Sequence, residues 1–125
     1  MASKRLARLN EQLKREISES IRTQVRDPRV GLVTVTAVEV AADLGSAKVY
    51  VRSTDDGVHR RATLEGLEAA APFIRTSLGR VLSLRRVPEL RFRWDRSLEH
   101  ASRIEEVLAS MVIPEEPPEP DGDDA

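Results

Sequence analysis

The chain has 125 residues, of which 40% are hydrophobic and 33% are charged, and it contains no cysteine. This length suits one domain with a substantial core. The lack of cysteine excludes a disulfide framework, a thiol nucleophile and thiolate metal sites. No apolar run resembles a signal segment or reaches the length of a membrane span, so we expect a soluble cytoplasmic protein.

The net charge of −1 conceals an uneven distribution along the chain. All 20 basic residues but only 15 of the 21 acidic residues lie within residues 1–112, which therefore carry a net charge of +5. Residues 113–125 are acidic and rich in proline, a composition typical of disorder because it offers no apolar surface to bury. We expect one domain over 1–112 and an acidic disordered tail over 113–125. The tail either aids solubility or mimics nucleic acid and shields the basic domain.

Residues 4–25 have the pattern of an amphipathic helix, with apolar residues every three or four positions from Leu6 to Val25. Basic residues align on nearly the opposite side of this helix. The row is either an ordinary solvated face or a stripe that follows phosphates. Its members are Lys4, Arg8, Arg15, Arg22 and Arg26.

Two β-strands are predicted next, over 32–40 and 47–53, because both segments are rich in β-branched residues. Pro28 and Gly31 end the preceding helix in a turn. Between the strands, Gly45 is expected to adopt a positive φ.

A second helical segment is predicted from Thr63, whose hydroxyl can cap its start. Its centre is unusual, because Ala70, Ala71 and Pro72 place an interior proline after two strong helix formers. The apolar pattern continues in register beyond the proline, which predicts a kinked pair of helices lining one core. The apolar positions are Leu64, Leu67, Ala71, Ile74, Leu78 and Val81.

A third strand over 90–94 and a last helix capped by Ser97 complete the prediction. Three strands with helices on one face make an α+β two-layer sandwich. Its open sheet face would present threonines and four basic residues, namely Lys48, Arg52, Arg91 and Arg93.

The sequence gives little support to an enzyme. His59 and His100 have neither a nucleophile nor a metal-ligand cluster near them in sequence. Asp43 and Asp95 could be offered as an acid–base pair, but a hairpin turn and a helix N-terminus explain them better. No phosphate-binding glycine motif occurs. We expect no catalytic residue, no metal and no cofactor.

The order α-β-β-α-kink-α-β is that of a type II KH domain, in which a GXXG loop between the central helices usually holds the nucleic-acid backbone. Here Ala70, Ala71 and Pro72 occupy that junction. The chain resembles the ribosome-binding factor A family over about residues 4–108, through an ordered set of stretches. These are EI at 16–17, DPRVG at 27–31, TVTAVEV at 34–40, DL at 43–44, AKVY at 47–50, AAPFIR at 70–75, LR at 84–85 and PELRFRWDRS at 88–97.

The resemblance implies a KH-like factor of bacteria that binds the small (30S) ribosomal subunit and its 16S rRNA. It also implies a role in late maturation of that RNA near its 5′ end, most important in the cold. No catalysis, cofactor, small-molecule substrate or membrane is implied. We expect a monomer. Two alternatives stay open, a general KH-type RNA chaperone and a protein-interaction adaptor.

The sequence departs from the family at the kink, where Pro72 replaces an expected glycine and removes a backbone N–H. If Pro72 began a new helix, the N–H groups of Phe73 and Ile74 would be free to bind a phosphate. Alternatively, Pro72 only shapes helix packing. Arg91 and Arg93 could serve a second face. The predicted RNA contacts are Lys4, Arg8, Arg15, Arg22, Arg29, Lys48, Arg75, Arg80, Arg85 and Arg86.

Overall fold

The computed structural model describes residues 4–54, 57–97, 105 and 107–110. Residues 1–95 and 96–125 are separate units, and the first contains the sheet and both long helices. Residues 105 and 107–110 are helical, as predicted for the last helix, and Ser97 is itself helical rather than a flanking cap. The remainder of that helix, including His100, and the predicted tail lie outside the described residues.

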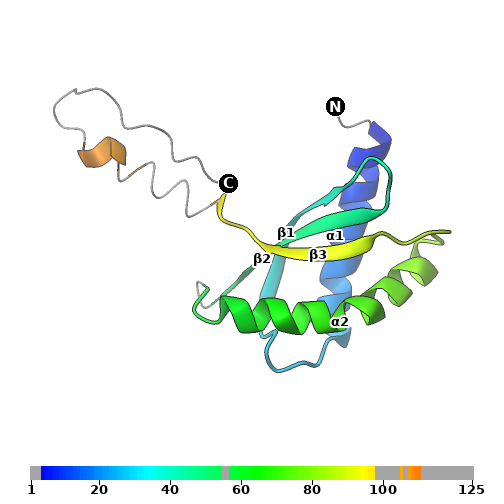
Figure 1. The fold of residues 1–125 in the computed structure, drawn as a ribbon, viewed down its shortest axis with the longest axis horizontal. Coiled ribbons are helices and arrows are strands. Elements are labelled where there is room, and N and C mark those ends of the chain that lie inside the picture. Colours follow the sequence, from blue (N-terminus) through cyan, green and yellow to red (C-terminus); the bar gives the residue numbers. More distant parts are fainter. Residues whose placement is uncertain (1–3, 55–56, 98–104, 106, 111–125) are drawn as a thin grey trace. The chain divides into compact units, whose positions relative to one another are not determined.

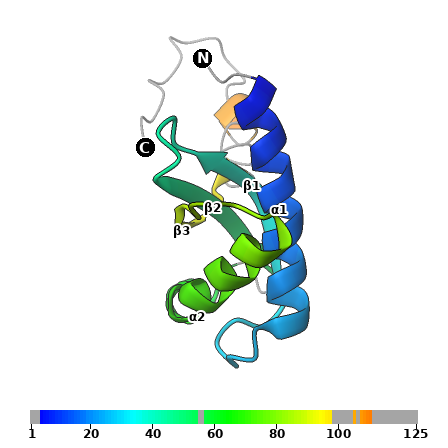
Figure 2. The same ribbon diagram turned by 90° about the vertical axis from the view of Figure 1, so that its right-hand side faces the viewer.

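The first unit is an α+β sandwich, as predicted (Figure 1). Its three-stranded sheet has the order β1-β2-β3, with β1 and β2 antiparallel and β2 and β3 parallel. Figure 2 shows both helices on the same side of this sheet. The elements are α1 (Lys4–Gln24), β1 (Val33–Val40), β2 (Ser46–Ser53), α2 (Arg60–Val81) and β3 (Glu89–Trp94).

The amphipathic pattern of α1 is confirmed. Leu13 and Ile17 are fully buried and Ile21 nearly so, while most charged residues of the helix face solvent. The side chain of Asn10 accepts a hydrogen bond from the backbone N–H of Val40 at 2.9 Å, which ties α1 to the end of β1. One face of α1 therefore belongs to the core and the other is available for binding.

The inner face of the sheet completes the core. Val49 and Val51 are fully buried on the central strand, and Leu90, Phe92 and Trp94 are buried on β3, as the alternating pattern predicted. This pattern places the polar residues of both strands on the opposite, open face.

The turn between β1 and β2 differs from the prediction, because Leu44 rather than Gly45 has the positive φ, at 62°. The N–H of Gly45 instead donates to the carboxylate of Asp43 at 2.9 Å. This hydrogen bond confirms the turn role of that aspartate.

The start of α2 corrects the capping prediction. The helix begins at Arg60, and Thr63 lies one turn inside it with only 2% of its surface exposed. The N-cap residue is His59, whose side chain makes no capping hydrogen bond. Threonine is a preferred N-cap residue, but here Thr63 is buried inside the helix. Its tertiary environment therefore overrides its local preference for a helix start.

The centre of α2 also corrects the prediction of two helices. One helix runs from Arg60 to Val81 with Pro72 inside it, and Figure 1 shows this helix changing direction along its length. The predicted apolar ridge does continue across the proline, but it stops short of Val81, which is 55% exposed. The buried members of the ridge are Leu67, Ala71, Ile74 and Leu78.

Candidate nucleic-acid interface

The predicted cations divide between the two faces of the sandwich. Cations of α1, of α2 and of the segment after α2 belong to the helical layer, which covers one side of the sheet (Figure 2). Lys48, Arg91 and Arg93 lie on β2 and β3 and point away from the core, because the alternate residues of these strands are buried against the helices. Arg91 and Arg93 also line the groove between β3 and α2. The structure therefore does not bring all the predicted contacts together.

The basic row on α1 is exposed. Lys4, Arg8 and Arg15 make no ion pair or side-chain hydrogen bond within the described part of the chain. Arg22 differs, because its guanidinium contacts the carboxylate of Glu19 at 2.7 Å, and this hydrogen bond raises the arginine pKa. The first three cations are thus the more available ones for a phosphate.

Arg29 is held by the turn that follows α1. Its guanidinium lies 2.6 Å from the carboxylate of Asp27, which also accepts the backbone N–H of Arg29 at 2.9 Å. These hydrogen bonds lower the pKa of Asp27 to about 2. A phosphate would have to compete with this carboxylate, so Arg29 is a weaker candidate contact than the sequence indicated.

The side chain of Arg75 forms hydrogen bonds that stabilise the fold. Its guanidinium donates to the carbonyl oxygens of Val87 and Pro88 at 2.8 and 3.1 Å. These bonds join α2 to the segment that enters β3, and the side chain is only partly exposed. Because Arg75 and Val87 are 12 residues apart in sequence, local sequence patterns did not predict this contact.

A second available group lies at the end of α2 and just after it. Arg80, Arg85 and Arg86 are exposed, and none forms an ion pair or side-chain hydrogen bond with another described residue. The apolar residues between and beside them anchor the segment to the core while the arginines stay at the surface. These anchors are Leu82, Leu84 and Val87.

The open sheet face has mixed charge. The guanidinium of Arg91 contacts the carboxylate of Glu89 at 2.9 Å. The Tyr50 hydroxyl donates a hydrogen bond to the carboxylate of Glu39 at 3.3 Å. Partial burial raises the pKa of Tyr50, and the negative charge of Glu39 raises it further. Lys48 and Arg93 of this face are exposed as well, whereas Arg52 is half-buried and donates to the carbonyl oxygen of Asp95 at 3.1 Å. The acids interspersed on this face weaken its match to a polyanion, as the exposed Glu11 and Glu19 do on α1.

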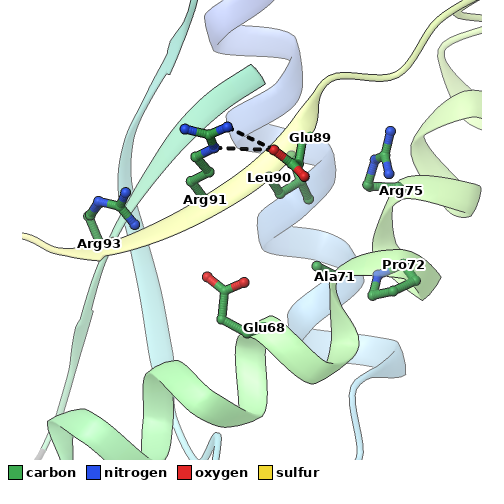
Figure 3. Close-up of a pocket in the computed structure, with 8 residues that line it drawn as sticks. All are labelled: Glu68, Ala71, Pro72, Arg75, Glu89, Leu90, Arg91 and Arg93. Atoms are coloured by element: carbon green, nitrogen blue, oxygen red, sulfur yellow. Dashed lines mark hydrogen bonds and ion pairs between the residues drawn. The ribbon is translucent and has the colours of Figure 1, made fainter. Parts of the chain in front are cut away.

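A shallow groove of about 470 Å³ lies between the bend of α2 and strand β3 (Figure 3). Ala71 and Pro72 line it from the helix and Leu90 lines it from the strand, whereas Ala70 is half-buried nearby. The charged residues of the lining are Glu68 and Arg75 on α2 and Glu89, Arg91 and Arg93 on β3. The groove is too open and too short of apolar lining to enclose a small molecule.

Charged side chains cover the outer edge of β3 beside this groove. Phe92 donates its backbone N–H to the carboxylate of Glu68 at 3.3 Å, and its carbonyl accepts from the guanidinium of Arg93 at 3.1 Å. Because these backbone groups already have partners, the edge is protected against pairing with another strand.

The predicted backbone donors at the kink are wrong. Phe73 and Ile74 lie inside a continuous helix rather than at the start of one, and Ile74 is completely buried. The carbonyl of Pro72 accepts the hydroxyl of Thr76 at 3.1 Å. What the bend does present to solvent is the side chain of Phe73, for which the sequence indicated no role.

Other kinds of site find no support in the part of the chain described. No group of three or more acidic, histidine or cysteine side chains there could hold a metal ion. No helix among those residues is long and apolar enough to cross a membrane.

The three-stranded mixed sheet, the helices on one face and the bent helix where a GXXG loop would lie define a KH-like α+β domain. Comparison with known proteins identifies its family. The sequence matches the family described as ribosome-binding factor A over residues 5–108, and the chain belongs to that family.

Individual relatives support the assignment over nearly the whole chain. A ribosome-binding factor A of Desulfitobacterium hafniense is 45% identical over 124 residues, 99% of each chain. That of Halothermothrix orenii is 46% identical over 116 residues, which cover 93% of this chain and 95% of the relative. Since this family is not one of enzymes, membership confirms the prediction that the protein is non-catalytic.

Solved structures share the fold. The crystal structure of ribosome-binding factor A from Thermus thermophilus is 34% identical, with a TM-score of 0.66 over 74% of this chain and 98% of that one. A solution structure from Thermotoga maritima, described as that of a putative ribosome-binding factor A, is 34% identical. Its TM-score is 0.68 over 79% of this chain and 94% of that one. A homology model of the Thermus factor, fitted into a cryo-electron-microscopy map of its 30S complex, is 34% identical. Its TM-score is 0.59 over 73% of this chain and 96% of that one.

Proposed function

We propose that this protein binds the small (30S) ribosomal subunit and assists late maturation of 16S rRNA in the cytoplasm. It acts as a monomer, without catalysis or a cofactor. The observation that carries this proposal is the 45% identity with a ribosome-binding factor A over 99% of both chains. The related Thermus factor, placed in a map of its 30S complex, supports the same partner.

The exposed cations of the helical layer are the proposed contacts to RNA. Each guanidinium or ammonium without an internal partner can exchange its hydration for a phosphate oxygen. Phosphate contacts fix position without reading sequence, which suits a factor that recognises a folded RNA surface. The cations form two groups, Lys4, Arg8 and Arg15 on α1, and Arg80, Arg85 and Arg86 at and after the end of α2.

The proposed mechanism is conformational. A protein that binds one arrangement of an RNA junction more tightly than another shifts the population toward the first. Bound to immature RNA near the 5′ end of the 16S molecule, the factor holds that arrangement until maturation weakens the contacts. This need is greatest in the cold, where misfolded RNA rearranges slowly.

A paired charge-removal experiment tests the proposed surface. The variant Arg80→Gln, Arg85→Gln, Arg86→Gln removes three cations from the helical layer. Its matched control, Lys48→Gln, Arg91→Gln, Arg93→Gln, removes three from strands β2 and β3. We expect the first to weaken binding to purified 30S subunits at least tenfold at about 0.1 M salt. Its log–log salt slope should fall by about 2 to 3, since each lost phosphate contact contributes about 0.7–0.9.

The control should bind within about threefold of the unmodified protein, because a change in total charge alone acts weakly beyond a Debye length of about 10 Å. Equal losses in both variants would show that net charge and not the helical layer governs binding. Failure of the unmodified protein to bind 30S subunits at any salt concentration would overturn the proposed function itself.

A further inference from the structure

One aromatic side chain faces solvent at the bend of α2. The chain has four aromatic residues, and the fold buries Phe92 and Trp94 and half-buries Tyr50. Phe73 is the exception, with 53% of its surface exposed. It follows Pro72, which is exposed as well, so two apolar side chains are exposed at the bend.

The exposure of Phe73 follows from its position on the helix. Ala71, Ile74 and Leu78 face the core, and Phe73 falls outside their ridge at about 100° per residue. An exposed ring is unfavourably hydrated, and no contact in the described core needs it. Such a ring is a candidate contact for a partner.

The residues on the same side of the helix indicate the chemistry of that partner. Arg80 lies seven residues after Phe73, two turns or roughly 10 Å along the axis. Because helical side chains lean toward the N-terminus, the long side chain of Arg80 can reach back toward the ring. Arg80 is exposed and has no partner among the described residues.

The neighbouring turns of α2 add no opposing charge. Ala69 and Thr76 lie about one turn before and one turn after Phe73, and both are exposed and uncharged. Neither therefore places a carboxylate beside the ring that would repel a phosphate. An aromatic face and a cation are the chemical features that this side of the helix offers to a partner.

We propose that Phe73 stacks on an unpaired base of the bound RNA while Arg80 contacts a phosphate beside it. An aromatic face next to a cation matches a single-stranded nucleotide, which offers a π-surface and a negative charge together. A base inside a double helix has no free face, so the occupant is an unpaired residue of a loop, bulge or end. The proposal rests on the proposed function and names a contact within it.

Substitutions at Phe73 and Val81 test the stacking contact. Val81 is the matched control, because it is apolar, 55% exposed and on the same half of α2, but has no ring. Binding to purified 30S subunits is measured against salt for Phe73→Ala, Phe73→Trp, Val81→Ala and Arg80→Gln. We expect Phe73→Ala to weaken binding by about 5- to 150-fold, the range for loss of one stacked base, with an unchanged salt slope. Phe73→Trp should bind like the unmodified protein, and Val81→Ala should have no effect.

Arg80→Gln should instead lower the salt slope by about 0.7–0.9, the signature of one lost phosphate contact. Equal weakening by Phe73→Ala and Val81→Ala would overturn the proposal and identify an apolar docking patch for a protein. Unchanged binding of Phe73→Ala, with steep salt dependence in all proteins, would overturn stacking and leave the proposed function intact. Thermal melting of each variant confirms folding, which an exposed side chain should not disturb.

Discussion

At the scale of single residues, Gly66 decides how closely the turn after α1 approaches α2. A Cβ atom at this position would lie 2.9 Å from Cγ2 of Val30 and 3.2 Å from Cβ of Arg29. Val30 is 4% exposed and belongs to the core, although the sequence marked its segment only as a turn. The missing side chain of Gly66 therefore allows the turn to close over the helix.

We expect Gly66→Ala to destabilise the protein by about 1 kcal/mol. Overpacking a tight contact costs about 1–3 kcal/mol, and the better helix propensity of alanine returns about 1 kcal/mol. Chemical denaturation measures the difference.

Ala69→Gly is the control for the propensity contribution, because Ala69 is exposed and lies in the same helix. This substitution should lower the free energy of unfolding by about 1 kcal/mol without any change in packing. An increase in stability for Gly66→Ala would show that the turn moves away without cost.

At the scale of elements, α2 combines a continuous core face with an interior proline. Pro72 has no N–H to donate to the carbonyl of Glu68, and its ring disfavours a straight helix. After the bend, the second half of α2 rises toward the segment that leads into β3 (Figure 1), and Arg75 binds that segment. The element is thus held by tertiary contacts more than by its own propensity.

We expect Pro72→Ala to raise the free energy of unfolding by about 1–2 kcal/mol. Alanine favours a helix interior over proline by about 3 kcal/mol, and part of that gain is lost because the packed helix keeps its bend. Affinity for 30S subunits should stay within about twofold, since Ile74 is buried and the backbone at the bend is not a proposed contact. A fall in stability, measured by chemical denaturation, would mean that the core requires the proline to bend the helix.

At the scale of the whole molecule, charge is separated along the chain. Residues 1–112 carry a net charge of +5 and the remaining residues carry six acids. Exposed cations occur on the helices and on the sheet, and acids accompany some of them on both, as Glu19 does Arg22 and Glu89 does Arg91. That residues 113–125 form a disordered acidic tail stays a prediction, as does its influence on RNA binding.

Removal of residues 113–125 tests that prediction. The net charge changes from −1 to +5, so we expect tighter binding to 30S subunits at low salt. The gain should shrink at about 0.15 M, where the Debye length is about 8 Å. The melting temperature should shift by no more than about 2 °C, because the tail offers no apolar surface to bury. A large loss of stability would show that these residues pack on the domain.

The sequence alone determined the class of the fold and the partition between core and surface, because side-chain periodicity depends only on local geometry. The patterns of α1, β2 and β3 predicted their buried faces correctly, and the ordered motifs predicted the family. Local signals failed where distant segments meet. The sequence predicted Thr63 as a helix cap, but this residue is buried. It predicted Arg75 as a phosphate contact, but this side chain donates to the carbonyl oxygens of Val87 and Pro88. Only the tertiary structure decided which cations are available and that Phe73 faces solvent, because both depend on what the rest of the chain packs against each residue.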